Sequence, residues 1–106
     1  MKVLLDECIP SRFRRYFKTH EVHSVEWAGF EGLKNGRLLT AAEQAGYEVL
    51  LSVDQGLATQ QNLDHRQIAI LIAQAPTNKI DDLVAFMTKI LDGLERIAPG
   101  TVLIID

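Results

Sequence analysis

The chain has 106 residues, of which 47% are hydrophobic and 24% charged, and its formal net charge at pH 7 is −3. These proportions are typical of one globular domain, here residues 1–106, and they exclude a disordered tail. The negative net charge argues against a protein that coats DNA, and the single cysteine excludes an intrachain disulfide. No apolar run approaches the roughly 18 residues of a membrane span, and Asp6 and Glu7 are unlike a secretory signal. We therefore expect a cytoplasmic protein without a membrane partner.

Five short apolar runs predict β-strands. Their ranges are Lys2–Leu5, Glu21–Val25, Glu48–Val53, Gln67–Ala73 and Thr101–Ile105. The runs are nearly continuous rather than alternating, which is typical of strands buried on both faces. Because helical patterns separate them, we expect an α/β fold, namely a three-layer α/β/α sandwich around a mainly parallel sheet of about five strands.

Three segments predict helices. Pro10–Lys18 is a short amphipathic segment, Asn35–Ala45 has Asn35 as its expected N-cap and Gly46 as its stop, and Thr77–Ile97 predicts one long helix. One face of this last helix is apolar and is expected to cover the sheet. A homodimer contact or a contact with a partner helix is the alternative use of that face.

Acidic residues follow two of the predicted strands. Asp6 and Glu7 end the first strand, and Asp54 ends the third. If these strands are neighbours, their carboxylates meet at the carboxyl edge of the sheet, where oxygen ligands suit Mg²⁺ or Mn²⁺. Such an ion can activate water and neutralise charge on a phosphodiester. The structural alternative is that Asp54 caps the following turn.

The stretches LLDECIP and HEVHSVEWAGFEGLKNGRLLTAAEQAGYEVLLSVDQGL present these features in a specific order. An Asp ends a strand, a polar residue opens a helix, and a glycine, an apolar strand and a second Asp follow. In this order the chain resembles the PIN-like nuclease superfamily over roughly residues 1–75, in detail the short PIN-like proteins related to VapC-type toxins. The resemblance implies a ribonuclease dependent on Mg²⁺ or Mn²⁺, with Asp6 and Asp54 as metal ligands. It also implies a toxin component restrained by an antitoxin protein.

The chain departs from the family pattern at two acidic positions. The position that opens the helix is usually Asp and is Asn35 here, and Gly56 stands where a second Asp is frequent. The mid-chain Glu of longer members has no counterpart. By resemblance, Asn35 assists the two ligands, with a carbonyl oxygen instead of a charge. Glu7, beside Asp6, is a candidate for an extra carboxylate, and Glu31 is the alternative. The departures favour an alternative function, in which an impaired PIN-like module binds RNA or a protein partner without cleavage.

Polar residues near the predicted site are candidates for binding RNA: Arg12, Arg15, Lys34, Arg37 and Gln55. The whole acidic excess of the chain lies in residues 54–106, so the net charge does not oppose a local basic rim. The alternative is that these side chains form ordinary solvated surface.

Two aromatic residues, the single cysteine and one alternative fold complete the predictions. Trp27 and Phe30 are expected to pack on the sheet, with base stacking as the alternative. Cys8 is expected to be a small buried residue rather than a nucleophile. A receiver-like signalling domain would also place acids after its first and third strands, but it needs a lysine at the end of the last strand, where this chain has Ile105 and Asp106.

Overall fold

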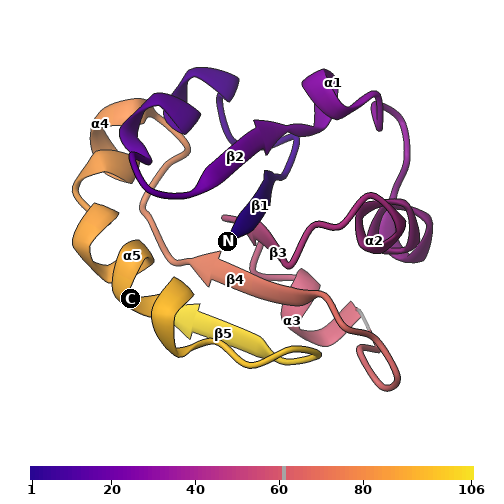
Figure 1. Ribbon diagram of the computed structural model, residues 1–106. Helices are drawn as coiled ribbons and strands as arrows, with labels where there is room; N and C mark the ends of the chain where they lie inside the picture. The colour runs from indigo at the N-terminus through magenta and orange to yellow at the C-terminus, as the bar shows by residue number, and fades with distance from the viewer. Residues whose placement is uncertain (61) are drawn as a thin grey trace.

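The computed structural model describes residues 1–60 and 62–106; the side chains of Asn35 and Gln60 also lie outside the described part. The predicted α/β sandwich is confirmed (Figure 1). One five-stranded sheet contains β1 (Lys2–Leu5), β2 (Glu21–Ser24), β3 (Val49–Ser52), β4 (Ala69–Ala73) and β5 (Val102–Ile105). Every pairing between neighbouring strands is parallel. All five predicted strands therefore form; β1 has the predicted bounds and the other four are shorter than predicted.

The order of the strands in the sheet is β2-β1-β3-β4-β5. The chain runs outward from β1 to β2, then crosses back to β3 on the other side of β1. Leu5 pairs with Ser24 of β2 and with Leu51 of β3. The order reverses between β1 and β3, and in open parallel sheets the crevice at the carboxyl end of such a reversal is where ligands bind. Asp6 and Asp54 follow these two strands.

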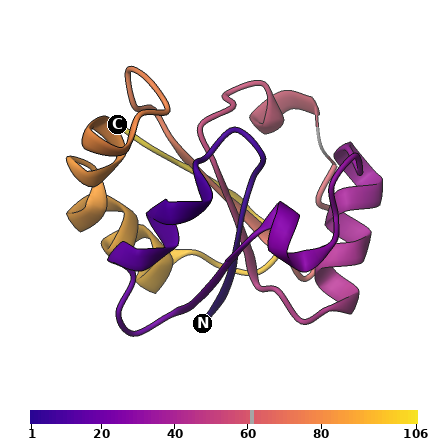
Figure 2. The ribbon, with the colours of Figure 1, turned by 90° about the horizontal axis from the view of Figure 1, so that it is seen from above.

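Helices cover both faces of the sheet (Figure 2). One face carries the 3₁₀-helix η1 (Ser11–Tyr16), α4 (Ile80–Val84) and α5 (Met87–Arg96), and the other carries α1 (Val25–Ala28), α2 (Asn35–Gln44) and α3 (Leu57–Gln60). Successive strand residues enter opposite cores, as Leu4 and Leu5 do in β1. Both residues are fully buried. This arrangement explains why the strands are apolar along their whole length.

The prediction of one helix over Thr77–Ile97 is wrong, since the segment forms α4 and α5. The Phe86 N–H donates to the Leu83 carbonyl at 3.0 Å, and this tight turn ends α4 and starts α5. The predicted apolar face is nevertheless in the core on both sides of the turn: Ile80, Leu83, Val84, Met87, Ile90, Leu91, Leu94 and Ile97.

The predicted short amphipathic segment Pro10–Lys18 forms a 3₁₀-helix, the shorter η1. The predicted N-cap of α2 needs correction. The N-cap of α2 is Lys34, whose backbone is extended, and Asn35 is the first helical residue. The turns α1 and α3 were not predicted, because four residues are too few to show helical periodicity. Across the part of the chain that the structure describes, no helix is long and apolar enough to cross a membrane.

Candidate metal and nucleic-acid site

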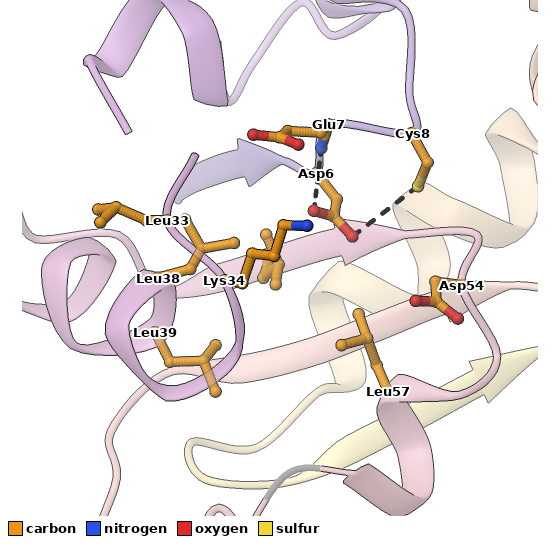
Figure 3. Close-up of a pocket in the computed structure, with 10 residues that line it drawn as sticks. Asp6, Glu7, Cys8, Leu33, Lys34, Leu38, Leu39, Asp54 and Leu57 are labelled. Carbon is orange, nitrogen blue, oxygen red and sulfur yellow. Dashed lines mark hydrogen bonds between the residues drawn. The ribbon is translucent and has the colours of Figure 1, made fainter. Parts of the chain in front are cut away.

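A cavity of about 390 Å³ opens at the carboxyl edge of the sheet, where the strand order reverses (Figure 3). We call it the carboxyl-edge cavity. It receives side chains from the end of β1, from the loop before α2, from α2 itself, and from β3 and the turn into α3. Its lining residues are Asp6, Glu7, Cys8, Leu33, Lys34, Leu38, Leu39, Leu50, Asp54 and Leu57. Four of the predicted site residues therefore share one cavity: Asp6, Glu7, Lys34 and Asp54.

Asp6 is held in place through its backbone and both carboxylate oxygens. Its N–H donates to the Leu51 carbonyl at 2.9 Å, which continues the β1–β3 ladder by one residue. Its Oδ2 accepts a 2.7 Å hydrogen bond from the Ser52 hydroxyl, and its Oδ1 accepts one of 2.9 Å from the Glu7 N–H. Oδ2 also accepts a hydrogen bond of 3.8 Å from the Cys8 thiol. Each carboxylate oxygen has two lone pairs, so the capacity left for a cation is on Oδ1.

Ser52 connects the two acidic positions. Its side chain is fully buried, and its hydroxyl donates to Asp6 while accepting the Asp54 N–H at 3.0 Å. The Cys8 sulfur lies 3.5 Å from the same hydroxyl. Ser52 is not among the predicted site residues. The sequence feature that could indicate its role is a single hydroxyl at the end of the apolar strand VLLS, because a buried hydroxyl must find hydrogen-bond partners.

Asp54 is exposed and forms the turn that leads into α3. Its Oδ1 accepts the Gly56 N–H at 2.9 Å, and its carbonyl accepts the Leu57 N–H at 3.2 Å. The turn-capping alternative is therefore present in the structure. It engages one carboxylate oxygen and leaves coordination capacity on the group, so capping and a site role are compatible.

Glu7 follows β1, and Lys34 ends the loop before α2; both line the cavity. Glu7 Oε1 accepts the Gly32 N–H at 3.1 Å, which fastens this loop to the end of β1. Lys34 follows shortly after, and Figure 3 shows its ammonium group extending toward the Asp6 carboxylate. Among the described residues, no ion pair within 4.0 Å includes either Asp6 or Asp54. Lys34 is thus the cationic side chain of a lining that also holds the carboxylates of Asp6, Glu7 and Asp54.

The pKa of Cys8 reflects the negative charges of Asp6 and Asp54 beside it. Burial raises the pKa of the Cys8 thiol, and the nearby charges of Asp6 and Asp54 raise it further. Hydrogen bonds with the Ser52 hydroxyl and the Val53 backbone oppose this rise without cancelling it. The thiol therefore stays protonated at neutral pH, which disfavours Cys8 as a nucleophile. A negative field of this kind attracts cations.

The donor set fits a partly hydrated divalent cation. Mg²⁺ is commonly held by one or two carboxylates, with water and substrate phosphate oxygens completing its coordination. Asp6 and Asp54 supply two carboxylates at one cavity. Over residues 1–60 and 62–106, no group of three or more His, Cys, Asp or Glu side chains is arranged to hold a metal ion. An ion held by Asp6 and Asp54 alone would take its remaining ligands from water or substrate.

Several predicted RNA-binding residues lie away from the cavity lining. Arg12 and Arg15 are exposed on η1, on the face of the sheet opposite α2 (Figure 2). Arg37 is exposed and lines a separate groove on α2, and Gln55 is exposed beside Asp54 without lining the cavity. Glu31 is exposed in the loop before α2. The side chain of Asn35 belongs to the part that is not described.

Trp27 does not pack in the core, and that prediction is wrong. Its side chain is 68% exposed and stacks on His23, with the ring centroids 3.9 Å apart. Ser24 caps α1 by accepting the Trp27 N–H at 3.1 Å, which starts a helical turn at the sheet margin and leaves this ring outside the core. Phe30, by contrast, packs against the core beneath α2 as expected.

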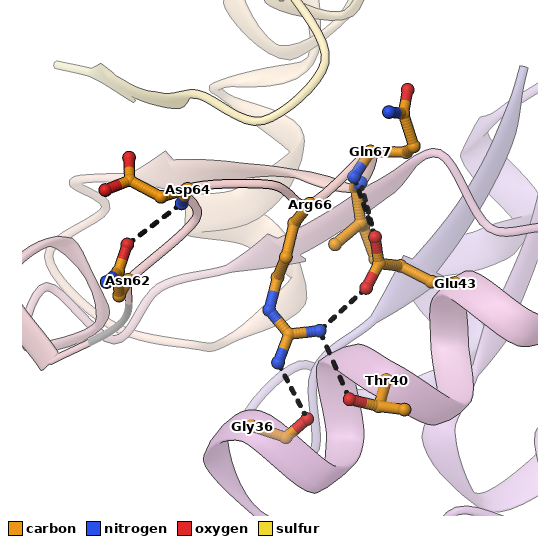
Figure 4. Close-up of polar contacts among 8 residues, drawn as sticks. Gly36, Thr40, Glu43, Asn62, Asp64, Arg66 and Gln67 are labelled. Carbon is orange, nitrogen blue, oxygen red and sulfur yellow. Dashed lines mark hydrogen bonds and ion pairs between the residues drawn. The ribbon is translucent and has the colours of Figure 1, made fainter.

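A second charged cluster lies at the opposite, amino edge of the sheet (Figure 4). Glu43 accepts hydrogen bonds from the Arg66 guanidinium at 2.7 Å and from the Gln67 N–H at 2.7 Å. Arg66 also donates to the Thr40 hydroxyl and the Gly36 carbonyl. We call these residues the amino-edge cluster. Its charges neutralise one another, so it links α2 to the start of β4 and is not a candidate site.

No protein-family model, curated protein or solved structure matches this chain.

Proposed function

We propose that the protein is a metal-dependent PIN-like ribonuclease that hydrolyses RNA phosphodiester bonds at the carboxyl-edge cavity. One observation carries the proposal. Asp6 and Asp54, which are far apart in the sequence, line the same cavity and are joined through the Ser52 hydroxyl. Parallel strand ends at a reversal of strand order are the expected place for such a site.

In this proposal the polar residues of the site have distinct roles. Asp6 and Asp54 hold Mg²⁺ or Mn²⁺, which when bound supplies a nucleophilic water and offsets phosphate charge. Ser52 fixes the orientation of Asp6 by hydrogen bonding. Lys34 attracts the phosphate by its charge. Glu7 holds the loop that carries Lys34, and a contribution from Asn35 to the metal or the substrate remains part of the proposal.

The partner in this proposal is an antitoxin protein. Support comes from the resemblance to VapC-type toxins, which are held inactive by a second protein. A homodimer would be a further assembly of the same chain. Light scattering of the purified protein measures its own oligomeric state.

The test combines cleavage with metal binding. Purified protein with Mn²⁺ should cleave RNA, and Asp6→Asn and Asp54→Asn should each lower the rate about a hundredfold or more, because a metal ligand is lost. Glu95→Gln is the matched control, since Glu95 is an exposed acid on α5 across the sheet. The proposal is wrong if the wild type cleaves no RNA with Mn²⁺ while Asp6→Asn binds Mn²⁺ unchanged.

A non-catalytic module is the second candidate. It is favoured by Asn35 and Gly56 at the two usual acidic positions and by the lack of a three-ligand group among the described residues. RNA binding that is tight, independent of Mn²⁺ and without cleavage would support it. A receiver-like phosphoacceptor is disfavoured, because β5 ends at Ile105 and its next residue is Asp106 rather than lysine.

A further inference from the structure

The two outer strands of the sheet differ in polarity. β2 ends the sheet on one side and reads EVHS, with an exposed Glu21, whereas β5 ends it on the other side and reads VLII (Figure 1). Proteins commonly protect an outer strand from pairing with a further strand by placing charged residues or proline in it. β5 has neither, and the side chain of Ile104 is 44% exposed. The outer edge of β5 is therefore open to another strand.

The backbone of β5 directs half of its hydrogen-bonding groups away from the sheet. The carbonyls of Thr101 and Ile105 accept hydrogen bonds of 2.9 and 2.8 Å from N–H groups of β4 and of the residue after it. Because these groups alternate in direction along a parallel strand, Leu103 also faces β4, whereas Val102 and Ile104 face outward. In the part of the chain that the structure describes, no strand pairs with this outward side. These groups are thus left for water or for another strand.

The outward groups of β5 are complementary to themselves. A twofold axis perpendicular to the sheet at Ile104 sets β5 antiparallel to the β5 of a second copy, with the two Ile104 residues opposite each other. The two residues then exchange N–H···O=C hydrogen bonds, and Val102 pairs in the same way with Asp106 of the second copy. The Asp106 carbonyl also accepts from Lys89 and keeps one lone pair. A shift of the axis by one residue in either direction leaves the outward groups at one end without a strand residue opposite.

The exposed side chain of Ile104 is covered in this register. Val102 packs against the core beneath α2 and Leu103 against the core beneath α5, so alternation directs Ile104 to the α2 face. Side chains directly opposite each other in an antiparallel pair lie on the same face, with their Cβ atoms about 5 Å apart. The two Ile104 side chains therefore contact each other and leave water.

Charges beside the strand fit the same axis. Asp92 and Arg96 on α5 line, together with β5, a groove of about 230 Å³, and their exposed side chains form an ion pair of 2.8 Å. Gly93 lies between them, and a Cβ on it would be 3.5 Å from Leu103 Cδ2, so the pair lies beside the middle of β5. The axis turns α5 antiparallel to its copy and brings Asp92 of each copy toward Arg96 of the other. Opposite charges therefore meet twice.

We propose that two copies of the chain form a homodimer through antiparallel pairing of their β5 strands, centred on Ile104, so that the two sheets become one. A second copy is the occupant because the backbone register and the charges of α5 both match themselves under a twofold axis. The inference gives the homodimer named above its surface and geometry, and it does not depend on ribonuclease activity. β4 separates β5 from β3, so the carboxyl-edge cavities stay accessible in the dimer.

The first experiment measures association by sedimentation velocity over a series of protein concentrations. The wild type should form a dimer with a dissociation constant of about 1–100 μM, since one strand pair with its flanking helices is a small interface. Ile104→Lys should raise this constant about tenfold to a hundredfold, because two ammonium groups would replace an apolar contact at the axis. Trp27→Lys is the matched control, since it also replaces an exposed apolar side chain by lysine, but beside β2. Thermal unfolding establishes that both variants fold.

The second experiment tests the register by disulfide formation. The Cα atoms of a hydrogen-bonded antiparallel pair are about 5.5 Å apart, which is within the range of a disulfide. Under mild oxidation Ile104→Cys should therefore form a covalent dimer. Glu21→Cys, which places a cysteine on the other outer strand, should not. The wild type contains Cys8 and supplies the background of both measurements.

The third experiment exchanges the charges. Asp92→Arg sets two arginines toward each other across the axis and should weaken association about tenfold. Adding Arg96→Asp to the same chain restores opposite charges at both contacts and should restore the wild-type dissociation constant. The charge contact is wrong if the double variant stays as weak as Asp92→Arg.

The outcomes separate this inference from the ribonuclease proposal. A wild type that is still monomeric at about 1 mM overturns the inference, and the ribonuclease proposal stands because its cavity lies within one chain. A dimer that Trp27→Lys dissociates, or that is cross-linked through Glu21→Cys and not through Ile104→Cys, also overturns it, because the contact would then lie at β2. A dimer that cleaves no RNA with Mn²⁺ supports the inference and counts against the ribonuclease alone.

Discussion

At the amino edge of the sheet, Glu43 meets the guanidinium of Arg66 and the backbone N–H groups that lead into β4. At the carboxyl edge, Asp6 and Asp54 meet a serine hydroxyl and backbone N–H groups, and no described ion pair includes either of them. Both edges place carboxylates beside strand ends. The charge of Glu43 is balanced by Arg66, and Glu43 links α2 to the start of β4. Asp6 and Asp54 have no such cationic partner among the described residues and line a cavity.

The largest expected effect on stability lies at the amino edge. Glu43→Ala removes the acceptor for Arg66 and for two backbone N–H groups, and we expect the free energy of unfolding to fall by about 2–3 kcal/mol. Asp54→Ala loses one exposed turn hydrogen bond and should cost about 0.5 kcal/mol. Urea denaturation of both variants measures the difference. Equal losses would contradict the contrast between the edges.

Close packing of Gly100 against the Arg66 backbone predicts the second-largest loss of stability. Gly100 has a φ of +71°, and a Cβ there would lie 2.7 Å from the Arg66 carbonyl oxygen. Gly100→Ala should therefore destabilise the fold by about 2 kcal/mol, through backbone strain and this clash. Gly32→Ala is the comparison, because its φ is +82° but no atom lies within 4 Å of the added Cβ. Thermal unfolding should rank Gly100→Ala as the more damaging change.

Two buried serines allow a matched test at the carboxyl edge. Ser52→Ala and Ser24→Ala each remove a buried hydroxyl from a strand end, and each should cost about 1–2 kcal/mol in denaturant unfolding. Only Ser52 contacts Asp6, so only Ser52→Ala should weaken Mn²⁺ binding, measured by calorimetry. The role given to Ser52 fails if both variants bind Mn²⁺ equally.

The pKa of Glu43 predicts a dependence of stability on pH. Burial opposes ionisation of this carboxyl, but hydrogen bonds from Gln67, Arg66 and Ile68 outweigh it and lower the pKa below the ordinary value of 4.5. The ionised Glu43 carboxylate therefore contributes fully to the free energy of unfolding above pH 4.5. This contribution is lost as the pH falls through the lowered pKa. Glu43→Gln should flatten the acid limb of the stability curve. If the stability of Glu43→Gln falls as steeply in acid as that of the wild type, the loss of stability comes from other acidic residues.

The smallest expected effect concerns Cys8. Burial, with Asp6 and Asp54 adding to it, raises the pKa of the thiol above its ordinary value of 9.0. Alkylation by iodoacetamide should therefore reach half its maximal rate only above pH 9. Asp54→Asn should move this midpoint slightly downward, because burial is the larger cause. An unchanged midpoint would show that the charge of Asp54 does not reach the thiol.

The sequence predicts the fold well for a physical reason. Strands buried on both faces must be apolar throughout, and such runs are visible in Ile68–Ala73 and Val49–Ser52. The break between α4 and α5 was missed because the apolar positions keep helical spacing through Ala85 and Phe86. That turn depends on how both helices reach the sheet, which is information from tertiary structure.

The candidate site was predicted in part. Strand ends locate Asp6 and Asp54, since parallel strands place their carboxyl ends at one edge. Arg12 and Arg15 do not line the cavity, because η1 packs on the opposite face of the sheet from α2, and their contact with RNA stays a prediction. The leucines of the lining could not be predicted, because Leu33, Leu50 and Leu57 come from a loop, a strand and a helix that meet only in three dimensions.

The strand order has a consequence for how the protein is made on the ribosome. β1, β2 and β3 are contiguous in the sheet, and β4 and β5 are then added at one side in the order of their synthesis. Every lining residue of the carboxyl-edge cavity lies at or before Leu57. The growing chain thus carries all of these groups before β4 has been translated, and the last two strands with α4 and α5 complete the support behind them.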